Sequence, residues 1–150
     1  MISLRVIVTF IGITASLLTA TAGAESVDDD RARQNYILNC QGCHLGDGSG
    51  SPGAVPNVRD FLGYFIHVPG GRDFIVQVPG AANSALDDEQ LAEVMNWMLL
   101  NFSRGQLPVD FVPYSAEEVS RLRQGVLADV QNPRAELILK IEEIQDRNGK

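Results

Sequence analysis

The residues best suited to chemistry lie close together in the first third of the chain. Cys40 and Cys43 are three positions apart, and His44 follows directly. Two thiols and an imidazole at this spacing can attach a haem covalently, form a redox-active dithiol pair, or contribute to a zinc site. The neighbouring sequence distinguishes these three chemistries.

The surroundings favour haem attachment. Both thiols of a Cys-x-x-Cys-His string can add across the two vinyl groups on one edge of a porphyrin, while a helical turn places the next imidazole over the iron. A thioredoxin-like pair normally follows a strand, whereas a helical pattern precedes Cys40. A zinc site that adds His67 is disfavoured, because adjacent Cys43 and His44 would have difficulty binding one tetrahedral ion. We therefore predict one covalent haem c, with Cys40 and Cys43 as thioether positions and His44 as an axial iron ligand.

The first 24 residues predict export. Arg5 precedes an apolar run over residues 6–18, and small residues at 20–24 follow it. This arrangement is typical of a secretory signal peptide, with cleavage expected after Ala24. An uncleaved membrane anchor is the less favoured alternative, because the run is short for a membrane span. We expect the mature protein in the periplasm, without stable membrane insertion.

The mature chain is acidic. Without residues 1–24 it has 11 basic and 19 acidic residues, a net charge of −8. Nucleic acids and anionic lipids would repel such a surface, so neither is an expected partner. The charge favours a redox partner with a basic docking patch.

Helical patterns surround the motif. Residues 29–39 place Ala32, Tyr36 and Ile37 on one helical face and lead directly into it. Residues 46–56 are rich in Gly, Ser, Asp and Pro, which predicts a loop that can wrap around a flat ligand. Capping signals and apolar spacing predict two short helices within 58–78 and further helices at 87–102, from 115 to about 130, and from 134 to about 147.

The length suits one compact domain with a leader and a tail, since 45% of the 150 residues are hydrophobic. We predict a signal peptide at 1–24, a haem domain at 25–103 and a helical C-terminal extension at 104–150. The order of helix, Cys-x-x-Cys-His, glycine-rich loop, irregular middle and strong final helix resembles the single-haem class I cytochrome c family over about residues 27–102. The resemblance implies an all-α fold around one covalent haem.

Further positions match this family. Pro56, twelve positions after His44, matches the proline whose carbonyl orients the proximal imidazole. The alternative is that Pro56 only shapes the loop. Trp97 matches an aromatic residue that packs on the N-terminal helix, where Tyr36 or Ile37 would face it.

The sixth iron position departs from the family pattern. A methionine usually precedes a proline in the loop before the last helix, but Val78 and Pro79 stand there. His67 is the remaining histidine and is our predicted iron ligand on that side, which would give a lower reduction potential than a Met/His pair. Met98 and Met95 are the alternative ligands. A third alternative is that the sixth position is vacant.

Other side chains are predicted to surround the haem. Arg59 and Arg72 are candidate partners of its propionates, because guanidinium binds a carboxylate with two parallel hydrogen bonds. A cluster of aromatic residues is expected to pack on the ring and exclude water, namely Phe61, Tyr64, Phe65 and Phe74.

These features predict an electron carrier rather than an enzyme. Its iron would cycle between ferrous and ferric states, taking electrons from a periplasmic dehydrogenase and passing them to a terminal acceptor. One alternative is a haem-based sensor or peroxidase-like protein with an open sixth position. Another is a fixed cytochrome subunit of a larger oxidoreductase, docked through residues 104–150.

Overall fold

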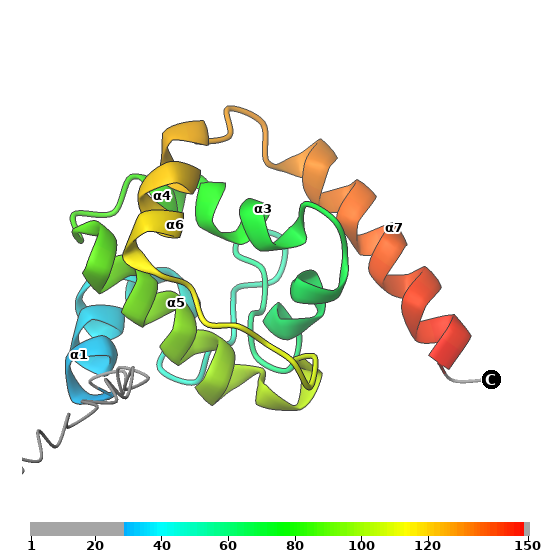
Figure 1. The fold of residues 1–150 in the computed structure, drawn as a ribbon, viewed down its shortest axis with the longest axis horizontal. Coiled ribbons are helices and arrows are strands. Elements are labelled where there is room, and N and C mark those ends of the chain that lie inside the picture. The colour runs from blue at the N-terminus through cyan, green and yellow to red at the C-terminus, as the bar shows by residue number, and fades with distance from the viewer. Residues whose placement is uncertain (1–28, 149–150) are drawn as a thin grey trace, which may run out of the picture.

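The computed structural model describes residues 29–148, and the predicted signal peptide lies outside them (Figure 1). The described chain is all-α, as predicted, and its only β-type pairing is the isolated bridge between Ser51 and Val55. The elements are α1 (Asp29–Asn39), α2 (Gln41–His44), η1 (Leu62–His67), α3 (Gly71–Gln77), α4 (Pro79–Ala82), α5 (Asp88–Phe102), η2 (Arg104–Gln106), α6 (Ala116–Leu122), η3 (Arg123–Gly125) and α7 (Gln131–Asn148). None of the described helices is long and apolar enough to cross a membrane.

Helices α1 and α5 form the base of the fold. Ala32 and Tyr36 of α1 are buried against α5, and the ring centroids of Tyr36 and Trp97 lie 5.2 Å apart. The predicted packing of Trp97 on the N-terminal helix is therefore confirmed, with Tyr36 rather than the exposed Ile37 as its partner. This contact fixes the end of α1, from which the Cys-x-x-Cys-His motif continues.

The start of α5 is set by its own sequence. The side chain of Asp87 accepts a hydrogen bond from Gln90 N at 2.8 Å, and the Gln90 side chain accepts one from Asp87 N at 3.2 Å. This is the predicted capping box, which satisfies two backbone N–H groups that the helix leaves without partners. The apolar face of α5 is buried over most of its length.

The middle of the chain has the predicted pair of short helices, η1 and α3, around a turn. Gly70 adopts a left-handed φ of 82° there, a conformation that glycine permits. The turn brings Phe65 and Phe74 together as a stacked pair with centroids 5.4 Å apart. The short α4 that follows was not predicted.

The segment after α5 packs back onto the same core. Val119 and Leu122 of α6 are buried, and α6 lies against α5. Leu137 and Ile141 of α7 are also buried, where α7 lies along η1 and α3 (Figure 1).

Two predicted boundaries in this segment were wrong. The helix expected to reach about residue 130 ends at Leu122, and η3 continues from there. The chain then turns, because Leu127 N donates a hydrogen bond to Gln77 O at 3.0 Å. The last helix begins at Gln131 rather than at 134, after Asp129 accepts a hydrogen bond from Gln131 N at 2.9 Å.

Candidate functional site

A single helical turn organises the motif. The amides of Cys43 and His44 both donate to the carbonyl of Cys40, at 3.1 and 3.0 Å. Cys40 N donates to Tyr36 O at 2.8 Å, so the turn is a direct continuation of α1. These bonds place both thiols and the imidazole within one short, ordered segment.

The two thiols differ in environment. Both cysteines are free, with Cys40 half-buried and Cys43 exposed. Burial, assisted by the neighbouring Cys43, raises the pKa of Cys40 to about 11. The Cys40 thiol is therefore protonated at neutral pH, and neither sulfur is tied up in a disulfide that would prevent thioether formation.

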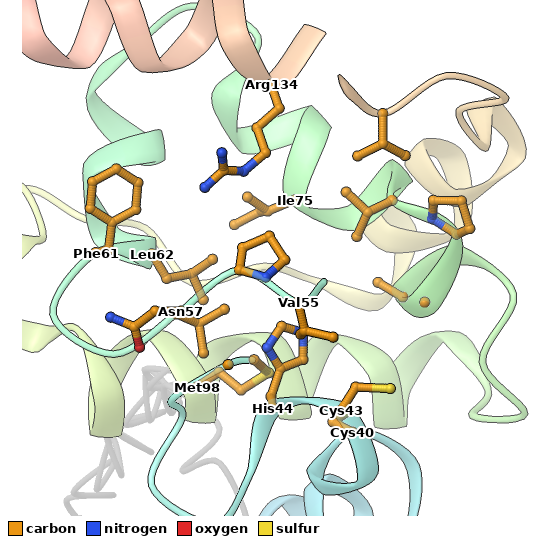
Figure 2. A pocket seen from close by; sticks show the side chains of 18 of the residues that line it. Cys40, Cys43, His44, Val55, Asn57, Phe61, Leu62, Ile75, Met98 and Arg134 are labelled. Atoms are coloured by element: carbon orange, nitrogen blue, oxygen red, sulfur yellow. The ribbon is translucent and has the colours of Figure 1, made fainter. Parts of the chain in front are cut away.

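A cavity of about 840 Å³ opens beside the motif (Figure 2). This volume is within the range of pockets that hold small molecules and cofactors. Cys40, Cys43 and His44 all line it. Most of the remaining wall is apolar and includes Phe61, Phe65, Phe74, Ile75, Leu91 and Val94.

His44 lies in the cavity wall, partly removed from water. Burial lowers the pKa of His44, and the Pro56 carbonyl opposes this with a smaller effect in the other direction. The Nδ1 atom of His44 is buried and has no hydrogen bond of good geometry with any described residue. The imidazole is thus neutral at physiological pH, which is the form that binds a metal ion.

The loop after the motif brings Pro56 to His44. Ser51 N donates to Val55 O at 3.0 Å, and Val58 N donates to Gly48 O at 3.0 Å, so the loop is closed on itself. Gly50 lies so close to Pro56 that a Cβ atom there would be 2.7 Å from its carbonyl oxygen. Of the predicted site residues, Cys40, Cys43, His44 and Pro56 line one cavity.

His67 is not brought to this cavity. Its side chain is exposed, and its Nε2 atom lies 2.8 Å from the carbonyl oxygen of Gln106. Residues three apart lie on one face of a 3₁₀ helix, so Tyr64 and His67 share a face of η1. Tyr64, predicted to pack on the haem, does not line the cavity either.

Two methionines of α5 do reach the cavity. Met95 and Met98 are both buried and line its wall. Together with the motif residues they are the lining side chains, within the described chain, of the types that commonly ligate haem iron.

The arginines predicted to bind propionates are engaged elsewhere. Arg59 pairs with Asp47 at 3.1 Å on the surface. Arg72 donates to both carboxylate oxygens of Glu118, at 2.6 and 2.7 Å, and neither arginine lines the cavity. Sequence reasoning missed Arg134 of α7, which does line it.

The residues present fit a covalently attached haem better than a zinc ion. No group of three or more His, Cys, Asp or Glu side chains among residues 29–148 is arranged to hold a metal ion. The donor set instead comprises two free thiols and one half-buried, neutral imidazole beside a large apolar cavity. That combination matches the needs of thioether attachment and axial ligation.

Comparison with known proteins agrees with this site. The chain matches no protein-family model, and no solved structure matches it. It is 28% identical over 110 residues to a cytochrome c-552 of Thermus thermophilus, an alignment covering 61% of this chain and 84% of that protein. A second cytochrome c-552 of the same species is also 28% identical over 110 residues, which cover 61% of this chain and 74% of the relative. The chain is thus similar to c-type cytochromes over more than half of its length.

Proposed function

We propose that this protein is a c-type cytochrome that carries single electrons. The observation that carries the proposal is that Cys40, Cys43 and His44 open together onto one apolar cavity. The similarity to the two cytochromes c-552 supports it. When bound, the haem would supply an iron that alternates between ferrous and ferric states.

The protein side chains hold and insulate that group. The Cys40 and Cys43 thiols would form the two thioether bonds, and His44 would ligate the iron through Nε2. The carbonyl of Pro56 is placed to accept a hydrogen bond from His44 Nδ1, which selects the tautomer and the ring plane. The apolar wall excludes water and so raises the cost of charging the iron, which tunes the reduction potential.

The proposal also covers which side chain would be the sixth ligand of the iron. To reach the cavity, His67 would have to break its contact with Gln106 O, and the backbone of η1 would have to rearrange. Met98 and Met95 need no such rearrangement, because both already line it. We therefore place methionine ligation ahead of His67.

The cellular setting follows from the sequence. A signal peptide at residues 1–24 would deliver the protein to the periplasm. The acidic surface would dock transiently on basic patches of a periplasmic dehydrogenase as donor and of a terminal acceptor, in the small interfaces typical of redox encounters.

A second candidate function is reversible binding of a small ligand at the iron. Both Met95 and Met98 are core residues of α5, at most 6% exposed, and α5 is fixed at its start by the capping box. A methionine held by core packing can remain a wall residue and leave the iron position vacant.

Absorption and electron spin resonance spectra of the ferric holoprotein separate these candidates. The wild type is compared with Met98→Leu, Met95→Leu and His67→Ala. A low-spin spectrum with a sulfur-to-iron band that disappears in one methionine variant would support the methionine-ligated carrier. Loss of the low-spin signal in His67→Ala would overturn our preference for methionine, and a high-spin wild type would favour the ligand-binding function.

A further inference from the structure

Arg134 brings the C-terminal helix into the site. It lies in the first turn of α7 and lines the same cavity as Cys40, Cys43 and His44. Figure 2 shows its side chain pointing into the pocket from α7, at the end of the view opposite His44. The helix that carries Arg134 begins about ninety residues after the motif.

Arg134 differs from the arginines in comparable environments. Within the described chain, three arginines are half-buried, and two of them are fully engaged. Arg72 forms its two bonds with Glu118, and Arg123 binds Asp88 at 2.9 Å as well as backbone carbonyls. Arg134 makes no side-chain hydrogen bond or ion pair with any described residue.

The described wall of the cavity offers Arg134 no counter-charge. The guanidinium group stays charged at all physiological pH values. No described Asp or Glu lines the cavity, and the labelled side chains nearest to this end in Figure 2 are those of Phe61, Leu62 and Ile75. A cation partly removed from water against apolar side chains is costly unless it meets an anion. A molecule that enters the cavity would supply such an anion.

The backbone holds Arg134 in this position. Asp129 accepts hydrogen bonds from Gln131 N at 2.9 Å and from the Asn132 side chain at 2.6 Å, which fixes the start of α7. Further along the helix, the buried Leu137 and Ile141 attach it to the core. The side chain is thus presented to the cavity by a packed helix rather than by a free tail.

We propose that Arg134 is the anion-binding group of this cavity and holds a carboxylate or small oxyanion within it. Guanidinium binds such groups with two parallel, charge-assisted hydrogen bonds. The proposal rests on the proposed function, which supplies two sources of the anion. One is a propionate of the attached haem, and the other is a free anion that enters from solvent toward the iron.

The test uses ferric and ferrous holoprotein of the wild type, Arg134→Gln and Arg134→Lys. Arg147→Gln is the matched control, because it removes the same charge from an exposed position near the end of the same helix. Haem content by pyridine haemochrome and thermal unfolding show that each variant is folded and loaded. Two readouts follow, namely the reduction potential between pH 5 and 9 and the binding of formate to the ferric protein.

The two sources give different results. If a propionate is the partner, the reduction potential plotted against pH changes slope near the pKa of that propionate. Arg134→Gln should raise the pH of this transition by about one unit, because loss of the cation favours the protonated carboxyl. Formate binding is then unchanged. If a free anion is the partner, formate affinity falls roughly tenfold and the pH dependence is unchanged. Arg134→Lys recovers part of either effect, since it restores the charge without the paired donors.

Either of these results supports the proposal. Equal behaviour of Arg134→Gln and Arg147→Gln in both readouts, at normal haem content, would overturn the anion-binding role alone. A wild type without thioether-bound haem would overturn the proposed function and this proposal with it. The haem measurement therefore separates the two failures.

Discussion

The hydroxyl of Tyr36 donates hydrogen bonds to the backbone carbonyl of His44, at 3.1 Å, and to that of Leu45. Tyr36 is buried in the α1–α5 interface, where its ring also contacts Trp97 and Phe102. Burial raises the pKa of Tyr36 to about 12, so the hydroxyl keeps its proton and remains a donor at physiological pH. One side chain thus joins the apolar core to the last residue of the haem-binding motif.

Replacement of Tyr36 by phenylalanine tests that connection. The variant keeps the ring but leaves the His44 and Leu45 carbonyls without this donor, so we expect a loss of about 1–2 kcal/mol in the free energy of unfolding. Urea denaturation of holoprotein measures it. Tyr64→Phe is the control, because the Tyr64 hydroxyl makes no hydrogen bond with a described residue. Equal losses in the two variants would show that the bond to the motif contributes nothing.

Asn96 joins α5 to the segment that precedes α6. Its side chain donates to Tyr114 O at 3.0 Å and accepts from Tyr114 N at 2.8 Å, both in the buried interior. Asn96→Ala leaves two buried backbone groups without partners, and we expect it to destabilise the protein by about 2–4 kcal/mol. Asn101→Ala removes only a bond to Trp97 O at the helix surface and should cost less than about 1 kcal/mol. A loss of stability in Asn96→Ala as small as that in Asn101→Ala would show that the Asn96–Tyr114 hydrogen bonds do not hold this segment on α5.

Gly50 is required by the close approach of two loop segments beside the site. An added Cβ atom would lie 2.0 Å from Val55 O and 2.7 Å from Pro56 O. Gly50→Ala must therefore displace Pro56 from His44, and we expect a loss of about 1–3 kcal/mol together with a changed ferric absorption spectrum. Gly105→Ala is the control, since nothing lies within 4 Å of its Cβ position. An unaltered spectrum in Gly50→Ala would show that Pro56 does not orient the His44 imidazole.

The packing of α7 on its own domain is tested at Ile141. This side chain is only 2% exposed, so Ile141→Ala should cost about 2–4 kcal/mol. Leu139, on the same helix, is 60% exposed, and Leu139→Ala should change stability by less than about 0.5 kcal/mol. If both variants were neutral, α7 would not pack on its own domain in solution. The helix would then be expected to bind a partner protein instead.

Local sequence predicted the fold best where a single segment carries the whole signal. The capping residues Asp87 and Gln90 marked the start of α5, and the spacing of Ala32 and Tyr36 gave the buried face of α1. Boundaries set by contacts with distant residues were missed. The end of α6 depends on the chain turning back to Gln77, which no pattern within residues 115–130 contains.

The same distinction applies to the site. Cys40, Cys43, His44 and Pro56 share the cavity because one turn and one closed loop hold them together. His67 was predicted because it is the remaining histidine, but its side chain lies at the surface beside Gln106 O. Arg134 reaches the cavity only through the packing of α7 on α3 and η1, and nothing in its local sequence separates it from a surface arginine.

The central claim is covalent attachment of one haem through Cys40 and Cys43. The direct measurement is intact-protein mass spectrometry with a pyridine haemochrome spectrum, on protein exported in cells that possess a haem-attachment system. We predict one added haem per chain, a haemochrome band typical of two thioether bonds, and a band shifted toward that of a single thioether in Cys40→Ala and in Cys43→Ala. A wild-type chain that carries only an oxidised Cys40–Cys43 disulfide and no added mass would contradict the claim.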